Sequence, residues 1–247
     1  MDAITLPGML ALGLAAMLTG MSKAGIPGLA FMAVPLFAMA VPPKASTGLL
    51  LPLLIVGDVF AVGWHHRAAD WRLLRRLLPW AVAGIAVGAF LLGQVDDRAL
   101  RLIMGALVVV LLLLHEWRKR RAGEPSAWLD SPRVGHAVGA VGGVTTMMAN
   151  AAGPVMALYF LAMRLPKREF IGTAAWFFLM VNLIKVPFSA GLGLITGPSL
   201  LLNLQLVPLV LAGAALGIWL SGRLDQARFE RIVEILTALA AIRLILG

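Results

Sequence analysis

Three polar side chains interrupt long apolar stretches of the chain. Asn182 and Lys185 lie within the apolar run 177–188, and Asp58 lies within the apolar run 46–63. Positions i and i+3 share one face of a helix, so the amide of Asn182 and the ammonium of Lys185 can point into one cavity. A lysine inside a membrane helix is energetically expensive and is usually functional, which predicts that Lys185 belongs to an anion pathway. The alternative is a structural ion pair, with Asp58 as the expected partner.

Asp58 and Asn182 occupy equivalent positions. Each lies ten residues after a glycine, Gly48 or Gly172, and each glycine follows a turn that contains proline and lysine. A carboxylate in an apolar helix is costly unless it is protonated or paired, so Asp58 is a candidate proton carrier. The alternative role is a salt bridge to Lys185 or Lys23 that only neutralises charge.

Two breaks, at residues 22–28 and 148–154, interrupt the apolar segments at corresponding places. Glycine and proline do not easily continue a helix, and proline prepares the backbone for a new first turn. A helix that restarts at Pro27 or Pro154 therefore has free N–H groups and a positive dipole end, which favour an anion. An ordinary tight turn is the alternative. The predicted substrate-binding residues of the breaks are Lys23, Gly25, Ile26, Pro27 and Gly28 in the first, and Asn150, Ala152, Gly153 and Pro154 in the second.

Lys23, in the first break, has two interpretations. Its ammonium can neutralise an anionic substrate, or it can extend to the membrane surface, as lysines near helix ends do. The sequence does not decide between them.

The composition indicates a chain that lives in lipid. Of its 247 residues, 60% are hydrophobic and 13% are charged, against roughly 25% charged in a soluble domain. The net charge of +9 comes from basic loops between apolar runs, which favours a topology signal over nucleic-acid binding. With no cysteine and no nucleophile, phosphate-loop or metal-protease motif, we expect neither an enzyme nor an ATP-driven pump, and no cofactor or metal.

The chain also repeats itself. Residues Pro79–Asp96 align without a gap with Pro208–Asp225, and eight of the eighteen positions are identical. Both copies contain a GxxxG pattern, which predicts close helix packing.

Ten apolar segments can be drawn, and several are shorter than the roughly 20 residues of a straight span. They are 3–20, 26–41, 46–63, 77–93 and 100–114 in the first half, and 135–149, 154–163, 171–190, 202–220 and 232–246 in the second.

These segments predict an all-α integral membrane protein of two inverted-topology repeats with about five helical segments each. About eight segments would cross fully and the others would be broken or re-entrant. The predicted divisions are an N-terminal repeat (1–114), a linker (115–134) and a C-terminal repeat (135–247).

The distribution of basic residues predicts the orientation in the membrane. With one crossing per segment, fifteen of the 21 Lys and Arg residues fall on the linker's side of the membrane and four on the other side. The positive-inside rule therefore predicts a cytoplasmic linker and two outward-facing termini.

The chain resembles the TauE/SafE family of sulfite-exporter-like membrane permeases. The resemblance covers almost the whole chain. It rests on the order and duplication of GMSKAGIPG (Gly20–Gly28), the proline–lysine turns before the two glycines, ANAAGP (Ala149–Pro154) and the repeated P-x4-G-x3-G. It implies a transporter with about eight crossings for small sulfur-containing anions such as sulfite or organosulfonates, in a bacterial inner membrane. Lys23 and Pro27 depart from the glycine-rich first break that is common in the family.

Together the residues and the resemblance predict a secondary transporter that binds its anion near the midplane, between two inverted repeats. Its expected partners are the lipid bilayer and a small anionic substrate; protons as the coupling ion and a homodimer are further candidates. Two other classes compete with a transporter. An anion channel would use the same cationic site without alternating access, and a membrane scaffold would need no charged residues within its helices.

Overall fold

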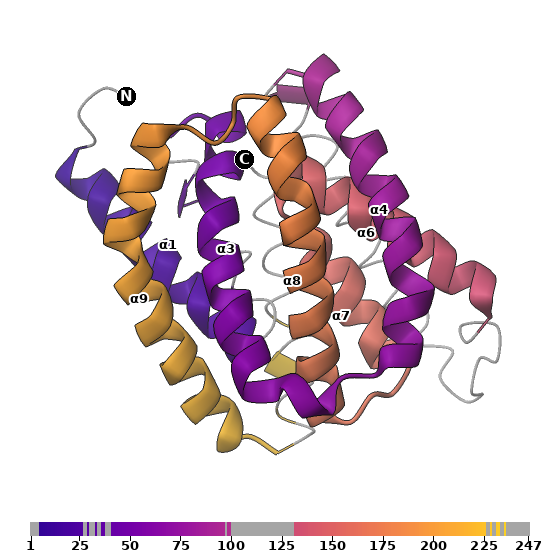
Figure 1. The fold of residues 1–247 in the computed structure, drawn as a ribbon. Coiled ribbons are helices and arrows are strands. Elements are labelled where there is room, and N and C mark those ends of the chain that lie inside the picture. Colours follow the sequence, from indigo (N-terminus) through magenta and orange to yellow (C-terminus); the bar gives the residue numbers. More distant parts are fainter. Residues whose placement is uncertain are drawn as a thin grey trace.

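The computed structural model describes residues 5–26, 29, 33, 36–37, 41–96, 98–99, 131–225, 228, 231–232 and 235. Three predicted segments (26–41, 100–114 and 232–246) and the linker lie wholly or mostly outside these residues, as do Pro27 and Gly28. Within the described part the secondary structure is entirely helical (Figure 1). Its helices are α1 (Leu6–Ala24), α3 (Pro43–His65), the short 3-10 helix η1 (His66–Ala68), α4 (Trp71–Gln94), α6 (Pro132–Ala149), α7 (Ala152–Ala162), α8 (Lys167–Gly191) and α9 (Gly197–Gly222).

The helix starts follow from local side-chain chemistry. Asp70 caps α4, because its carboxylate accepts hydrogen bonds from the backbone N–H groups of Arg72 and Leu73. Thr196 and Ser199 form a reciprocal capping box at the start of α9. The predicted segment 77–93 began six residues too late, since the capped first turns of α4 are rich in arginine and escape a hydropathy criterion.

Five described helices are long and apolar enough to cross a membrane. They are α1, α3 extended through η1, α4, α8 and α9. Their length and composition confirm an α-helical membrane protein. The eight crossings and the inverted repeats stay predictions.

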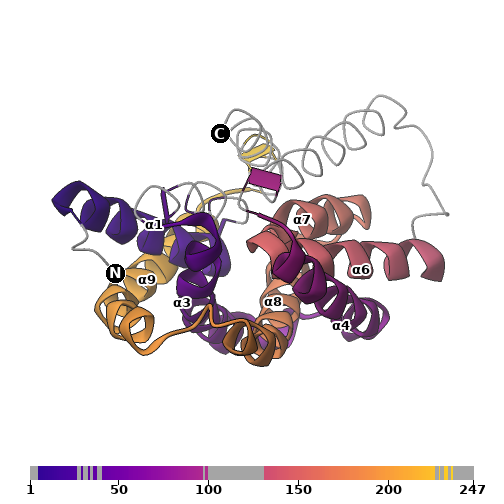
Figure 2. The ribbon, with the colours of Figure 1, turned by 90° about the horizontal axis from the view of Figure 1, so that it is seen from above.

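Most of the helices group into two large cores, each of which mixes the first and second halves of the chain, and a smaller cluster of α1, α3, α8 and α9 residues adds to them. In one core α1 and α3 pack with α9; in the other α4 packs with α6, α7 and α8. Figure 2 shows these groups on opposite sides, with α3 and α8 adjacent between them. The N-terminal helix of each half thus contacts the last described helix of the other half.

The two GxxxG patterns make these crossed contacts. A Cβ atom added at Gly84 of α4 would lie 2.1 Å from the carbonyl oxygen of Ala140 in α6. One added at Gly213 of α9 would also lie 2.1 Å from a carbonyl oxygen, that of Met17 in α1. The backbones are so close that only glycine fits, which confirms the predicted packing role of both patterns.

We expect Gly213→Ala to destabilise the protein by about 1–3 kcal/mol, because the added methyl group forces α1 and α9 apart. Gly63→Ala in α3 is the matched control, since an added Cβ there meets nothing within 4 Å. It should be neutral or stabilise by up to about 1 kcal/mol through helix propensity. Thermal unfolding in detergent measures both. Equal unfolding temperatures for the two variants would contradict the close approach of α1 and α9.

Candidate functional site

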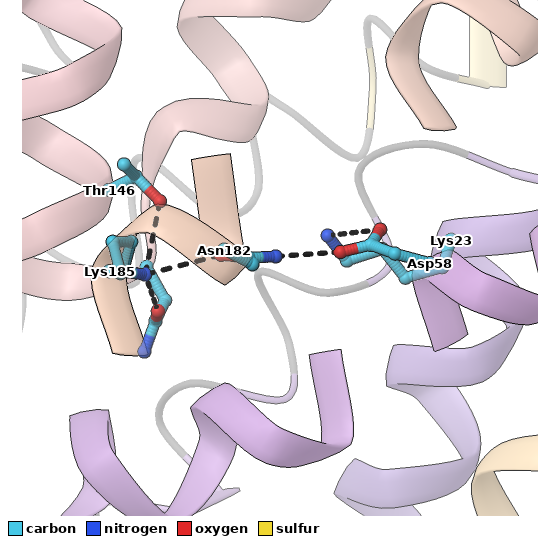
Figure 3. A network of polar contacts seen from close by, with 6 residues as sticks. Lys23, Asp58, Thr146, Asn182 and Lys185 are labelled. Atoms are coloured by element: carbon cyan, nitrogen blue, oxygen red, sulfur yellow. Dashed lines mark hydrogen bonds and ion pairs between the residues drawn. The ribbon is translucent and has the colours of Figure 1, made fainter. Parts of the chain in front are cut away.

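A chain of polar contacts crosses the centre of the molecule and joins the two cores. The Nζ atom of Lys23 in α1 lies 2.9 Å from Oδ1 of Asp58 in α3. The other carboxylate oxygen of Asp58 accepts a 2.7 Å hydrogen bond from Nδ2 of Asn182 in α8. Asn182 in turn accepts a 3.3 Å hydrogen bond from Nζ of Lys185. Figure 3 shows Asn182 in the middle, with Lys185 on one side and the Lys23–Asp58 pair on the other.

Lys185 is buried among neutral groups. Its residue is 2% exposed, and its ammonium donates to Oγ1 of Thr146 (3.3 Å), Oδ1 of Asn150 (2.5 Å) and Oδ1 of Asn182. These oxygens solvate the ammonium but carry no formal negative charge. Among the described residues, Lys185 therefore has no anionic partner within ion-pairing distance. The predicted structural alternative, a Lys185–Asp58 ion pair, is wrong.

Asp58 pairs with Lys23 instead. The carboxylate is fully buried and the Lys23 side chain is 8% exposed, so this cation does not reach the membrane surface. Its ammonium also lies 4.2 Å from the centre of the Phe178 ring, which adds a cation–π contact. The charge-neutralising salt bridge considered for Asp58 is thus present, with Lys23 as its partner. Lys23 lies one residue before Ala24, the last residue of α1, and its buried side chain faces the protein interior.

Asn150 is positioned by the second break. It ends α6 in the left-handed backbone conformation, with a φ angle of 53°, which asparagine adopts more readily than most residues. Its side chain turns toward the centre, where Nδ2 donates to the carbonyl oxygen of Thr47 in α3 and Oδ1 accepts from Lys185. The next helix, α7, begins at Ala152, so the predicted restart at Pro154 was two residues too late. The side-chain amide of Asn150 therefore connects the end of α6 to α3, through Thr47, and to α8, through Lys185.

The first break contacts both α9 and α3. A Cβ added at Gly25 would lie 2.0 Å from the carbonyl oxygen of Gly217, so Gly25 serves close packing. The carbonyl oxygen of Ala24 lies 3.1 Å from Nε2 of His65 at the end of α3. Ile26 is buried beside them, at 3% exposure. The described part of this break is therefore held from two sides.

A cavity of about 50 Å³ opens beside the polar chain. That volume exceeds the roughly 10–15 Å³ that one water molecule needs. Five predicted site residues line it: Lys23, Asp58, Asn150, Gly153 and Asn182. Lys185 does not line the cavity itself, but its three hydrogen-bond partners, Thr146, Asn150 and Asn182, do. Gly25, Ile26 and Ala152 are not among the lining residues. The remaining wall is mostly apolar. Most of it comes from α7 and α8, including Met156, Phe160, Phe170 and Phe178, and Ser22, Leu54 and Thr146 complete it.

Thr146 is the site residue that sequence reasoning missed. It lines the cavity and accepts a hydrogen bond from Lys185, yet it lies in a helix dominated by glycine, valine and alanine. Its spacing was the available signal, because residues i and i+4 share a helix face and Thr146 lies four residues before Asn150.

Membrane-length helices around a buried, charged cavity define a class: polytopic membrane proteins with a polar site at the centre of the bundle. The chain belongs to the sulfite exporter TauE/SafE family, which it matches over residues 11–244. The family expected from the motifs is thereby confirmed.

One curated relative is a probable inner membrane transporter protein, TsaS, from Comamonas testosteroni. It is 28% identical over 109 residues, and the match covers 44% of this chain and 44% of that protein. The match thus spans less than half the length of the relative. No solved structure matches the chain significantly. Family and relative both indicate a multi-pass inner membrane protein of the permease type.

Proposed function

We propose that this protein is a secondary transporter that moves small sulfur-containing anions, such as sulfite or organosulfonates, across the inner membrane. One observation carries the anionic nature of the cargo: the ammonium of Lys185 is buried and bonded only to neutral oxygens, and the three residues that supply these oxygens line a cavity. A buried charge is costly unless it is compensated. An anion that binds in the cavity supplies the missing countercharge, and the sulfur chemistry follows from the family.

The breaks contribute to the same site. Gly153 lines the cavity in the first turn of α7, where unpaired backbone N–H groups and the helix dipole favour negative charge. Asn150 and Asn182 provide amide groups that can bond an oxyanion. The crossed packing of α1 on α9 and α6 on α4 is the pattern expected of two inverted repeats around this cavity, and it supports alternating access between them. In this mechanism Asp58 carries the proton if transport is proton-coupled.

Transport in proteoliposomes tests the proposal. We expect saturable uptake of sulfite or an organosulfonate that is accelerated by unlabelled substrate on the opposite side, because alternating access exchanges one anion for another. Uptake without saturation or trans-stimulation would indicate a channel, and no uptake of any anion would favour a scaffold. If Lys185→Ala and Asn182→Ala both transport at the normal rate, the anion site is elsewhere.

A further inference from the structure

The cavity carries a defined formal charge. Two lysines and one aspartate are buried in the connected polar chain: Lys23, Lys185 and Asp58. Lys23 and Asp58 cancel in their ion pair, and Lys185 remains. The other contacts in the chain come from Thr146, Asn150 and Asn182, which are neutral. The described polar chain therefore has a net formal charge of +1.

No other described residue changes this count. The remaining cavity-lining residues are uncharged, and Lys, Arg, Asp and Glu elsewhere in the described ranges are half-buried or exposed. Charges near water are screened, whereas charges in a buried cavity interact strongly. An anion in the cavity thus meets an excess of one positive charge.

We propose that the cavity selects singly charged anions over doubly charged anions of the same shape, and that Asp58 sets this preference. The inference rests on the proposed anion site and specifies the charge of its cargo. A monoanion brings the buried group to neutrality, while a dianion leaves one negative charge uncompensated in a low-dielectric interior. Transport of a dianion would require one further proton, and the carboxylate of Asp58 is the acceptor within the chain of contacts.

The internal repeat supplies the decisive substitution. Asp58 has the neutral Asn182 as its equivalent, so this helical position accommodates an amide in the other half of the same protein. Asn is also nearly the same size as Asp. Asp58→Asn raises the net charge of the buried group from +1 to +2, and Lys23→Met combined with Asp58→Asn returns it to +1. The preference should follow the charge through this series.

Methanesulfonate and sulfate are suitable probes. Both are tetrahedral around sulfur, but methanesulfonate carries one negative charge and sulfate carries two. Their dissociation constants are measured on the full chain in detergent at matched ionic strength by the ligand-dependent rise in unfolding temperature. Sulfate also stabilises proteins without binding, so the shift of a Lys185→Met variant is subtracted at each concentration.

The wild type should bind methanesulfonate at least about 10-fold more tightly than sulfate. Asp58→Asn should reverse the order, and the double variant should restore it. Glu169→Gln, which removes an exposed acid from the first turn of α8, changes the charge of the protein but not of the cavity and should keep the wild-type order.

The possible failures are distinct. If the wild type binds either probe but Asp58→Asn leaves the ratio of dissociation constants unchanged, the role of Asp58 in charge selection is wrong while the anion site stands. If neither probe nor sulfite binds to the wild type or to Asp58→Asn, the charge selection and the proposed anion site both fail. Tighter binding of sulfate than of methanesulfonate by the wild type overturns the charge selection alone.

Discussion

Replacement of Lys185 by methionine should abolish anion binding without unfolding the protein. Methionine fills a similar volume but carries no charge, so the buried group becomes neutral and an anion in the cavity loses its countercharge. Loss of one partner from a buried charge pair costs about 2–5 kcal/mol, which predicts a fall in affinity of about 30-fold or more. Uptake by proteoliposomes and binding in detergent measure the effect.

Stability should respond differently from binding. Methionine removes three hydrogen bonds from the ammonium to neutral oxygens, but it also removes the desolvation penalty of an uncompensated charge, and these changes offset one another. The free energy of unfolding should therefore stay within about 1 kcal/mol of the wild type, or rise. Lys185→Arg keeps the charge, and Arg133→Met removes an exposed cation instead. Normal binding by Lys185→Met would remove Lys185 from the site, and equal loss in Arg133→Met would show a general charge effect.

Replacement of Lys23 by methionine should have the largest effect on stability. It leaves the fully buried carboxylate of Asp58 without its ion-pair partner, with one hydrogen bond from Asn182 to stabilise the negative charge. Breaking a buried pair in this way costs about 3–5 kcal/mol. The variant should unfold at a markedly lower temperature, and it should also lose anion binding because the buried group becomes neutral.

The double variant Lys23→Met/Asp58→Asn separates the ion pair from the general packing of Lys23. Without either charge, most of the lost stability should return, and a double-mutant cycle gives the coupling energy between the two side chains. Thermal unfolding of the four proteins supplies the cycle. A double variant as unstable as Lys23→Met alone would mean that Lys23 acts through its packing against Phe178 rather than through Asp58.

The membrane environment, most helix positions in the described ranges and two of the three buried charges, Lys185 and Asp58, could be predicted from the sequence. Apolar segments longer than a bilayer requires predict spanning helices, because backbone hydrogen bonds within lipid can only be made inside a helix or closed barrel. A charged residue in such a segment must face the protein interior, which is why Lys185 and Asp58 could be selected without a structure. Helical periodicity also places Asn182 and Lys185 on one face, since that relation is local.

Which of these groups contact one another depends on how the helices pack, and this could not be predicted from the sequence. Lys23 pairs with Asp58 across 35 positions of the sequence, and Asn182 reaches Asp58 across 124. Such contacts depend on how α1, α3 and α8 pack, and the two cationic candidates for Asp58 looked alike in the sequence. Packing is set by the glycine contacts that draw α1 onto α9 and α6 onto α4. In this arrangement α1 places Lys23 beside Asp58, which is the one buried carboxylate among the described residues. Lys185 therefore has no acidic partner in the described part of the chain.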